Sequence, residues 1–147
     1  MAQEQVVVFH LGKEEYGVPI HQVREIIQYK GATKMPGAPA FFEGIINLRG
    51  KIIPVIDLAA KFGVDAQSGQ RQALVIELAE QTVGVVVDTV SEVLWLEDSA
   101  IEAPPAQATA RDAFIRGIGK NRDRLLILLE LNNVMARDEW SAVQAAS

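Results

Sequence analysis

The sequence predicts an all-β protein made of two small β-barrels that are related by internal duplication and share a hydrophobic core. Three observations support this prediction. The apolar runs are short, rich in valine and isoleucine, and bounded by turn-forming residues, which is typical of strands. Two blocks of sequence recur in the same order in the two halves of the chain. Segments with helical spacing are few and short.

The expected strands follow the apolar runs in chain order. Runs of this length between glycine, aspartate, asparagine or lysine are long enough for a strand but short for a buried helix. Hairpin turns are expected at Gly12–Gly17, at Leu78–Gly84 and at Arg49-Gly50, where turn-forming residues separate two apolar runs. The predicted strands lie in Val6–Phe9, Ile45–Ile56, Ala73–Leu78, Val83–Val87 and Leu125–Leu129.

Proline and helix-forming segments refine this picture. Pro54 lies inside an apolar run, and because proline cannot donate a ladder hydrogen bond, it is expected at a sheet edge, a strand start or a bulge. Helix is expected as single turns at Val23–Ile27, Leu58–Phe62 and Ser91–Leu94, and as a carboxyl-terminal helix over Asn132–Val143.

The internal repeat consists of two aligned blocks. Val8–Ile27 aligns with Val75–Leu94, and Gly44–Leu58 aligns with Gly117–Leu131. The same order of blocks in both halves favours a true duplication over the general likeness of hairpins. Five or so short strands in each half suggest a small closed barrel, because closure removes exposed strand edges.

The two halves are expected to form one domain over residues 1–147. Each half is near the lower size limit for independent folding, so the barrels should share an apolar seam. The expected intertwined subdomains are approximately residues 12–72 and 73–134. The amino-terminal strand is a candidate member of the second subdomain.

Composition excludes several classes of function. The 147 residues are 49% hydrophobic and 22% charged, with a formal net charge of −5, which gives no electrostatic argument for binding nucleic acid or an anionic membrane. The absence of cysteine excludes disulfides and thiol catalysis. The amino terminus lacks the basic segment of a signal peptide, and the apolar stretches are too short to span a bilayer. We expect a cytoplasmic protein without direct membrane insertion.

The sequence contains no motif for catalysis or metal binding. The two histidines, His10 and His21, do not form an H-x-x-x-H or H-E-x-x-H pattern, and no G-x-S-x-G segment is present. The segment GIINLRGK differs from a phosphate-binding loop in its glycine spacing, and Ile52 stands where serine or threonine would bind magnesium. We expect no enzymatic activity, no metal and no cofactor.

Four segments stand in a specific order along the chain: LGKEEYGVPIHQVREII, PGAPAFFEGIINLRGKIIPVIDLAAKFG, VGVVVDTVSEVL and IRGIGKNRDRLLILLEL. In this order they resemble the CheW family, the adaptor proteins of bacterial chemotaxis. The pattern NLRGxIxPxxDL is the most specific of these features. The resemblance covers roughly Val6 to Val134, and it is to the free-standing adaptor rather than to the related regulatory domain of the kinase CheA.

The resemblance implies two five-stranded SH3-like barrels around a shared core and no enzymatic activity. It implies that the protein bridges the cytoplasmic tips of methyl-accepting chemoreceptors and the regulatory domain of CheA. Receptor helices would dock near the cleft between the barrels. The protein would then be recruited from the cytoplasm to membrane-associated receptor arrays.

Arg49 and Glu25 are the leading candidates for a functional pair. Arg49 matches the arginine of the family's NLRG motif, and Glu25 matches the glutamate of its VxEI motif. We expect them to form a partly buried ion pair, because an arginine among apolar strands needs a planar acceptor. The pair either only fixes the bend of the hairpin or also shapes a surface for a partner. Asn47, included in this partner-binding set, is expected to support the turn.

Four apolar residues are further candidates for partner binding: Val23, Ile27, Val90 and Val93. Such residues are either core residues or part of an exposed groove that accepts an amphipathic helix. The repeat-related Val23 and Val90 are the first choices for receptor contact.

The remaining motif residues are expected to be structural. Gly44 and Gly50 should serve backbone geometry, and Pro54 and Asp57 complete the motif at the strand and at its end.

Two other functions stay open at the level of sequence. One is an adaptor of the same family in another receptor–kinase pathway, such as twitching motility or surface sensing. The other, with less support, is a small-molecule-binding barrel, for which the sequence offers no convergent set of polar residues.

Overall fold

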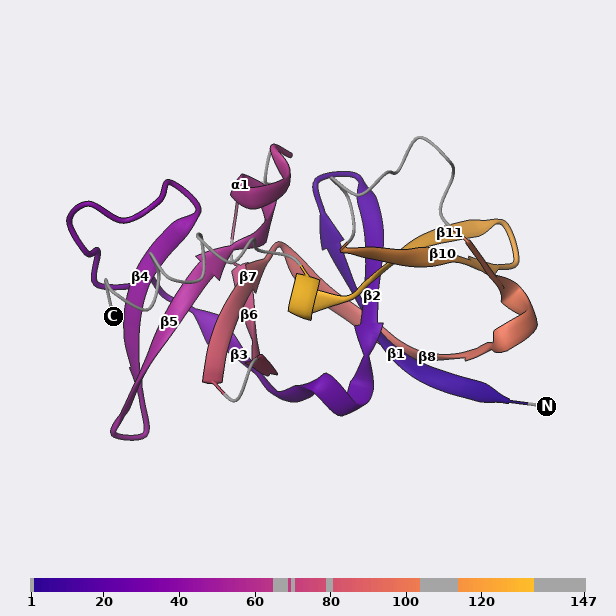
Figure 1. Cartoon of the computed structure of the whole chain (residues 1–147), viewed down its shortest axis with the longest axis horizontal. Helices are drawn as coiled ribbons and strands as arrows, with labels where there is room; N and C mark the ends of the chain where they lie inside the picture. Colours follow the sequence, from indigo (N-terminus) through magenta and orange to yellow (C-terminus); the bar gives the residue numbers. More distant parts are fainter. Residues whose placement is uncertain (1, 65–68, 70, 79–80, 104–113, 134–147) are drawn as a thin grey trace.

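The computed structural model describes residues 2–64, 69, 71–78, 81–103 and 114–133, and these residues are mostly in strands (Figure 1). The strands are β1 (Gln3–Leu11), β2 (Glu14–Pro19), β3 (Val23–Tyr29), β4 (Phe42–Leu48), β5 (Lys51–Asp57), β6 (Arg71–Leu78), β7 (Gln81–Val87), β8 (Thr89–Glu97), β9 (Ile101–Glu102), β10 (Ile115–Asn121) and β11 (Arg124–Leu129). The helical elements are α1 (Leu58–Phe62) and the 3₁₀ turns η1 (Ile20–Gln22), η2 (Asp98–Ala100) and η4 (Leu131–Asn133). No helix in the described ranges is long and apolar enough to cross a membrane.

The strands form two mixed sheets that lie side by side. The six-stranded sheet has the order β8-β1-β2-β11-β10-β9, and the five-stranded sheet has the order β3-β6-β7-β5-β4. In Figure 1 the five-stranded sheet occupies the left half of the molecule and the six-stranded sheet the right half. The predicted all-β fold with two related halves is confirmed.

The duplication is visible in the register of the parallel strand pairs. On β5, Val55 lies opposite Gly84 of β7, and on β11, Leu128 lies opposite Gly17 of β2. These four residues occupy equivalent positions in the aligned blocks of sequence. The two glycines are also equivalent in packing, because an added Cβ would lie 3.2 Å from Val55 or 3.1 Å from Leu128. Both halves therefore use the same close approach of two strands.

The hairpin that opens each repeat joins the sheet of the other repeat. The β1–β2 hairpin pairs with β8 and β11, and the β6–β7 hairpin pairs with β3 and β5. Sheet membership therefore divides the chain differently from the expected subdomain bounds, 12–72 and 73–134. The cause is pairing between strands that are far apart in the chain, antiparallel for β1 with β8 and β3 with β6 and parallel for β2 with β11 and β7 with β5. Parallel strands are not joined by a short turn, so the sequence gives no local signal for these pairs.

Two predicted helical turns are strands in the structure. Val23–Ile27 lies in β3, and Ser91–Leu94 lies in β8. Exposure alternates residue by residue along both strands, which is the period of a strand with one half-buried face. Pairing with β6 and with β1 decides this conformation, because tertiary context overrides weak local propensity in short segments.

The predicted turn at Leu58–Phe62 is confirmed as α1. The Asp57 side chain accepts a hydrogen bond from the backbone N–H of Ala60 at 3.3 Å, which caps the helix. Gly63, in the left-handed conformation with φ 70°, ends it. Most of the predicted carboxyl-terminal helix, 132–143, lies outside the described residues, which end in the 3₁₀ turn η4.

Pro54 lies at a position of β5 where only one neighbouring strand is paired, next to the register shift between Phe42 and Gly44 of β4. It stands inside β5, which has β7 on one side and β4 on the other. It is paired with Ile45 of β4, and the parallel pairing with β7 begins one residue later, at Val55. A central strand therefore tolerates the proline at the point just before its second neighbour begins to pair.

Among the described residues, the strand pairings form an open series in each sheet and do not close into a ring of hydrogen bonds. Side chains connect separate strands instead. Tyr29 Oη, on the edge strand β3, donates to Glu43 Oε1 on the edge strand β4 at 2.6 Å. Burial raises the pKa of Tyr29, and the hydrogen bond to Glu43 raises it further. In the six-stranded sheet, Arg116 Nη2 on β10 donates to Glu4 Oε1 on β1 at 2.5 Å.

The two sheets share one hydrophobic core, as predicted. Its largest cluster combines β1 and β2 residues such as Phe9 and Val18 with β6 and β7 residues such as Leu74 and Val85. A smaller cluster around Val8 lies in the six-stranded half, and another around Val55 lies in the five-stranded half. The chain thus has a common seam between the halves and a separate interior in each.

Aromatic rings cross this seam. Phe9 stacks on Tyr16 with ring centroids 5.8 Å apart, and Tyr16 lies 5.9 Å from Phe62 of α1. Phe62 in turn stacks on Phe114 at 4.7 Å. Because Phe62 follows β5 of the five-stranded sheet and Phe114 precedes β10 of the six-stranded sheet, the series of rings joins the two halves of the molecule.

Gly44 gives a test of this architecture. Its φ is 139°, and a Cβ at this position would overlap the carbonyl oxygen of Thr33, which accepts from the Ile45 N–H at 2.9 Å. Gly44→Ala should therefore lower the free energy of unfolding by about 3 kcal/mol or more, measured by urea titration. Gly50→Asn is the control, because Gly50 has φ 85° and open space around it, and asparagine tolerates this conformation. Equal stability of Gly44→Ala and the wild type would contradict the steric argument.

Candidate functional site

The hairpin between β4 and β5 presents Arg49 at its tip. Arg49 and Gly50 form a two-residue loop between Leu48 and Lys51, with φ of 51° and 85° respectively. The Asn47 side-chain oxygen accepts a hydrogen bond from the Gly50 N–H at 2.8 Å. The turn-supporting role predicted for Asn47 is confirmed. Positive φ at both loop positions matches the turn type that joins twisted strands.

The predicted pair between Arg49 and Glu25 is present. Arg49 Nη2 donates to Glu25 Oε2 on β3. This hydrogen bond and the charge of Glu25 raise the pKa of Arg49. The arginine side chain is 69% exposed and that of Glu25 is 31% exposed, so the guanidinium lies at the surface rather than partly buried. An exposed pair stabilises a fold little, which leaves Arg49 accessible to a partner.

Further charged side chains surround this pair. Arg24 Nε lies 3.1 Å from Glu77 Oε1 on the neighbouring strand β6. Lys51 Nζ donates to Thr82 Oγ1 at 3.2 Å, and Thr82 Oγ1 donates to Glu77 Oε1 at 3.0 Å. A hollow of about 250 Å³ lies among them, and three of its lining residues are cationic: Arg24, Arg49 and Lys51.

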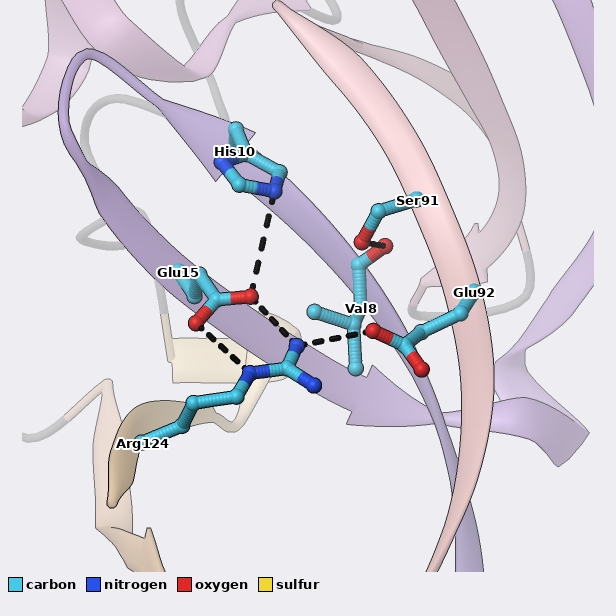
Figure 2. Close-up of polar contacts among 6 residues, drawn as sticks. All are labelled: Val8, His10, Glu15, Ser91, Glu92 and Arg124. Atoms are coloured by element: carbon cyan, nitrogen blue, oxygen red, sulfur yellow. Dashed lines mark hydrogen bonds and ion pairs between the residues drawn. The ribbon is translucent and has the colours of Figure 1, made fainter. Parts of the chain in front are cut away.

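The equivalent end of the second half carries a different network, shown in Figure 2. Arg124 on β11 holds Glu15 of β2 through two hydrogen bonds, from Nε to Oε2 at 3.1 Å and from Nη2 to Oε1 at 2.5 Å. The same Nη2 donates to Glu92 Oε2 on β8 at 2.8 Å. His10 Nε2 lies 3.8 Å from Glu15 Oε1. One guanidinium therefore ties three strands together.

This network shifts the pKa values of Glu15 and Arg124 in opposite directions. The hydrogen bond from Arg124 lowers the pKa of Glu15, although burial of the carboxyl acts the other way. The hydrogen bonds to Glu15 and then to Glu92 raise the pKa of Arg124. Both groups therefore stay charged across the physiological range.

Sequence reasoning missed Arg124 and Glu15. The repeat alignment contains a signal for them, because it places Glu92 opposite Glu25 and Arg124 opposite Lys51. A basic residue at the start of the apolar run of β11, opposite a repeated carboxylate, indicates a second ion pair. The direct counterpart of Arg49 is Arg122, and it does not make that pair.

The four apolar candidates do not form one surface. Val23 and Val90 are half-buried and pack against the shared core, and Ile27 packs against the interior cluster of the five-stranded half. Val93 lies on the opposite face of β8 from Val90 and is 47% exposed. The structure thus brings Val23 and Val90 to the same core and separates Val93 from them.

Several exposed apolar side chains were not singled out from the sequence. Their positions follow from the alternation along β3 and β8 and from the outer faces of β5 and β11. They are Ile26 at 40%, Ile52 at 54%, Trp95 at 62% and Leu125 at 62%. The period of a strand, once assigned, is the signal that would have found them.

Asp57 has the structural role expected of it. In addition to capping α1, its Oδ1 accepts a hydrogen bond from Arg71 Nη2 at 2.9 Å. Burial lowers the pKa of Arg71, but the hydrogen bond and charge of Asp57 raise it by more. The described ranges contain no group of three or more His, Asp or Glu residues placed to hold a metal ion.

Comparison with known proteins identifies the relatives of this chain. A family model described as a CheW-like domain matches residues 5–139. The chemotaxis protein CheW of Klebsiella aerogenes is 37% identical over 95% of this chain and 86% of its own length. Protein PilI of Pseudomonas aeruginosa is a weaker match, with 28% identity over 75% of this chain and 64% of its own length.

A solved structure has the same fold. The crystal structure of the scaffolding protein TtCheW from Thermoanaerobacter tengcongensis superposes with a TM-score of 0.86 at 38% identity. The similarity covers 94% of this chain and 96% of that chain.

The Glu15–Arg124 contact predicts a pH dependence of stability. Because the folded-state pKa of Glu15 is lowered, its contribution is complete above the unfolded value of about 4.3 and is lost as pH falls through the folded value. The stability difference between wild type and Glu15→Gln should therefore be large at pH 7 and shrink toward pH 3, measured by urea unfolding. Glu14→Gln, which leaves Arg124 untouched, is the control. A difference that does not change with pH would contradict this account.

Proposed function

The chain belongs to the CheW family and acts as an adaptor in chemotaxis, and from this premise we propose that it couples the cytoplasmic tips of chemoreceptors to the regulatory domain of the kinase CheA. The observation that carries the proposal is the agreement of the whole described fold, both sheets included, with a scaffolding protein of this family. Similarity at this level of identity and coverage supports a shared role and not only a shared fold.

The proposal includes no catalysed reaction. The family is one of non-enzymatic scaffolds, and this supports the absence of an activity, a metal and a cofactor. The charged networks found here join strands to one another, so they have a structural explanation without catalysis. An adaptor acts through its surfaces, and its work is to hold two other proteins at a fixed distance.

We assign two surfaces to the partners. The first is the tip of the β4–β5 hairpin with Arg49, Glu25 and Asn47, where an exposed guanidinium is held by one carboxylate. The second is the region of the half-buried Val23 and Val90, which pack against the shared core and near which receptor helices would dock. Val93, which is exposed on β8, and Ile27, which packs in the five-stranded half, would be separate partner contacts outside this surface.

The proposed location follows from the proposed partners. The adaptor would be cytoplasmic and would be recruited to membrane-associated arrays through the receptors rather than by inserting into the bilayer. No contact with nucleic acid is proposed. An adaptor for another receptor–kinase pathway is the second candidate. It has less support, because the similarity to protein PilI is weaker than the similarity to the chemotaxis proteins.

Titration with both partners tests the proposal. The wild type should bind the regulatory domain of CheA from the same organism in a saturable one-to-one complex, measured by isothermal titration calorimetry. Val90→Lys should weaken binding of a receptor fragment by about tenfold or more, because a buried charge disrupts the apolar contact, and leave CheA binding unchanged. Val90→Thr keeps the shape of the side chain and tests the same contact if the lysine variant unfolds. A folded wild type that binds neither protein would overturn the function.

Arg49→Glu tests the first surface. The substitution places two carboxylates side by side at the hairpin tip, yet the fold should survive because the side chain is mostly exposed. Kinase activation in a reconstituted mixture of receptor, CheA and adaptor should be abolished. Lys13→Glu makes the same charge change in the β1–β2 turn and serves as the control. Full activation by Arg49→Glu, with an unchanged circular dichroism spectrum, would remove Arg49 from the functional surface.

A further inference from the structure

The strand β8 carries a β-bulge near its start. Its register with β1 shifts by one residue between Val90 and Glu92, so Ser91 is the extra residue of the strand. β8 is an edge strand of the six-stranded sheet. Bulges are frequent at sheet edges and beside functional sites, where they change the direction of a side chain. The bulge at Ser91 therefore decides how the side chains next to it are directed.

The strand β3, an edge strand of the five-stranded sheet, carries the same bulge. Its register with β6 shifts between Val23 and Glu25, so Arg24 is the extra residue. In the aligned blocks of the repeat, Val23–Glu25 corresponds to Val90–Glu92. In each half, therefore, a valine that we place near the docked receptor helices comes directly before the bulge, and a glutamate comes directly after it.

An arginine holds this glutamate in both halves, but the two arginines come from different places. Arg49 in the β4–β5 loop donates to Glu25, and Arg124 on β11 donates to Glu92 Oε2 at 2.8 Å. The repeat places Lys51, rather than Arg49, opposite Arg124. Because the two halves form the same contact with side chains that are not equivalent, the duplication explains the bulges but does not explain the held carboxylates.

Two further hydrogen bonds fix β8 around its bulge. Ser91 Oγ donates to the backbone oxygen of Val8 at 3.3 Å, and Figure 2 shows this contact beside the held carboxylate of Glu92. The Val90 N–H donates to Gln72 Oε1 on β6 at 2.7 Å, which ties the start of β8 to the five-stranded sheet. The backbone at Val90 is therefore held by the other sheet, and the residues that follow it are held by the bulge contacts.

We propose that Glu92 is a positioning residue for receptor docking: held by Arg124, it fixes the bulge and thereby keeps Val90 directed at the shared core, near which receptor helices would dock. The inference rests on the proposed adaptor function and adds to it a residue that acts without touching the receptor. Stability explains the contact less well, because the side chains of Arg124 and Glu92 are 35% and 38% exposed and exposed pairs stabilise a fold little. Protection of the sheet edge also explains it less well, since a bulge hinders edge pairing without a held carboxylate.

Glu92→Ala and Arg124→Lys test the inference from the two sides of the contact. The lysine reproduces the residue of the first half, Lys51, which donates to the hydroxyl of Thr82. Each variant should weaken binding of a receptor fragment by about threefold to tenfold and leave binding of the CheA regulatory domain unchanged, both measured by calorimetric titration. The double variant should bind no more weakly than the single variants, because both changes break one contact. In the free variants the methyl resonances of Val90 should shift, measured by nuclear magnetic resonance.

The controls distinguish this inference from the adaptor function. Glu97→Ala removes an exposed carboxylate from the end of the same strand and should change neither binding nor the resonances of Val90. Glu92→Gln, which keeps the shape of the side chain, takes the place of the alanine variant if that variant unfolds. Unchanged receptor binding by the folded variant, an equal loss of affinity for both partners, or additive losses in the double variant would overturn the inference and leave the adaptor function standing. A wild type that binds neither partner would overturn the adaptor function and the inference with it.

Discussion

The first strand of each repeat is buried on both faces, and the rest of the architecture depends on this constraint. On β1, Val7 and Phe9 face the shared core, whereas Val6 and Val8 face the interior of the six-stranded half. A strand with two apolar faces must be covered on both sides. Full burial of one such side chain is worth roughly 1.5–3 kcal/mol, more than an exposed ion pair contributes. The exchange of hairpins between repeats supplies the two covers.

Polar side chains connect strands that backbone hydrogen bonds do not join. In the part of the chain that the structure describes, both sheets end in edge strands with a neighbour on one side, apart from the bridge of Thr33 to Ile45 on β4, and exposed edges invite pairing with other chains. In the five-stranded sheet Tyr29 and Glu43 join the edge strands β3 and β4, and in the six-stranded sheet Arg124 joins β11 to β2 and to β8. The fold therefore rests on its apolar seam, and the ion pairs shape the ends of the molecule. An adaptor needs such defined ends, since its partners recognise surfaces rather than a cavity.

The candidate site could be predicted in part from the sequence. The pair of Arg49 and Glu25 and the turn contact of Asn47 followed from motif residues whose chemistry demands a partner. The second network did not, because Glu92 pairs with Arg124 rather than with Arg122, the residue that the repeat places opposite Arg49. A repeat alignment gives equivalent backbone positions, but which of two neighbouring side chains reaches a carboxylate depends on three-dimensional geometry.

The sequence by itself determined the strands made of apolar runs, the hairpin turns, the duplication and the shared core, because hydrophobic pattern and turn chemistry are local properties. Only the tertiary structure decided that Val23–Ile27 and Ser91–Leu94 are strands, that Pro54 lies in a central strand, and that each opening hairpin belongs to the other repeat. These features depend on pairing between residues far apart in the chain. A short segment takes the conformation that its neighbours in space allow, and those neighbours lie far from it in the sequence.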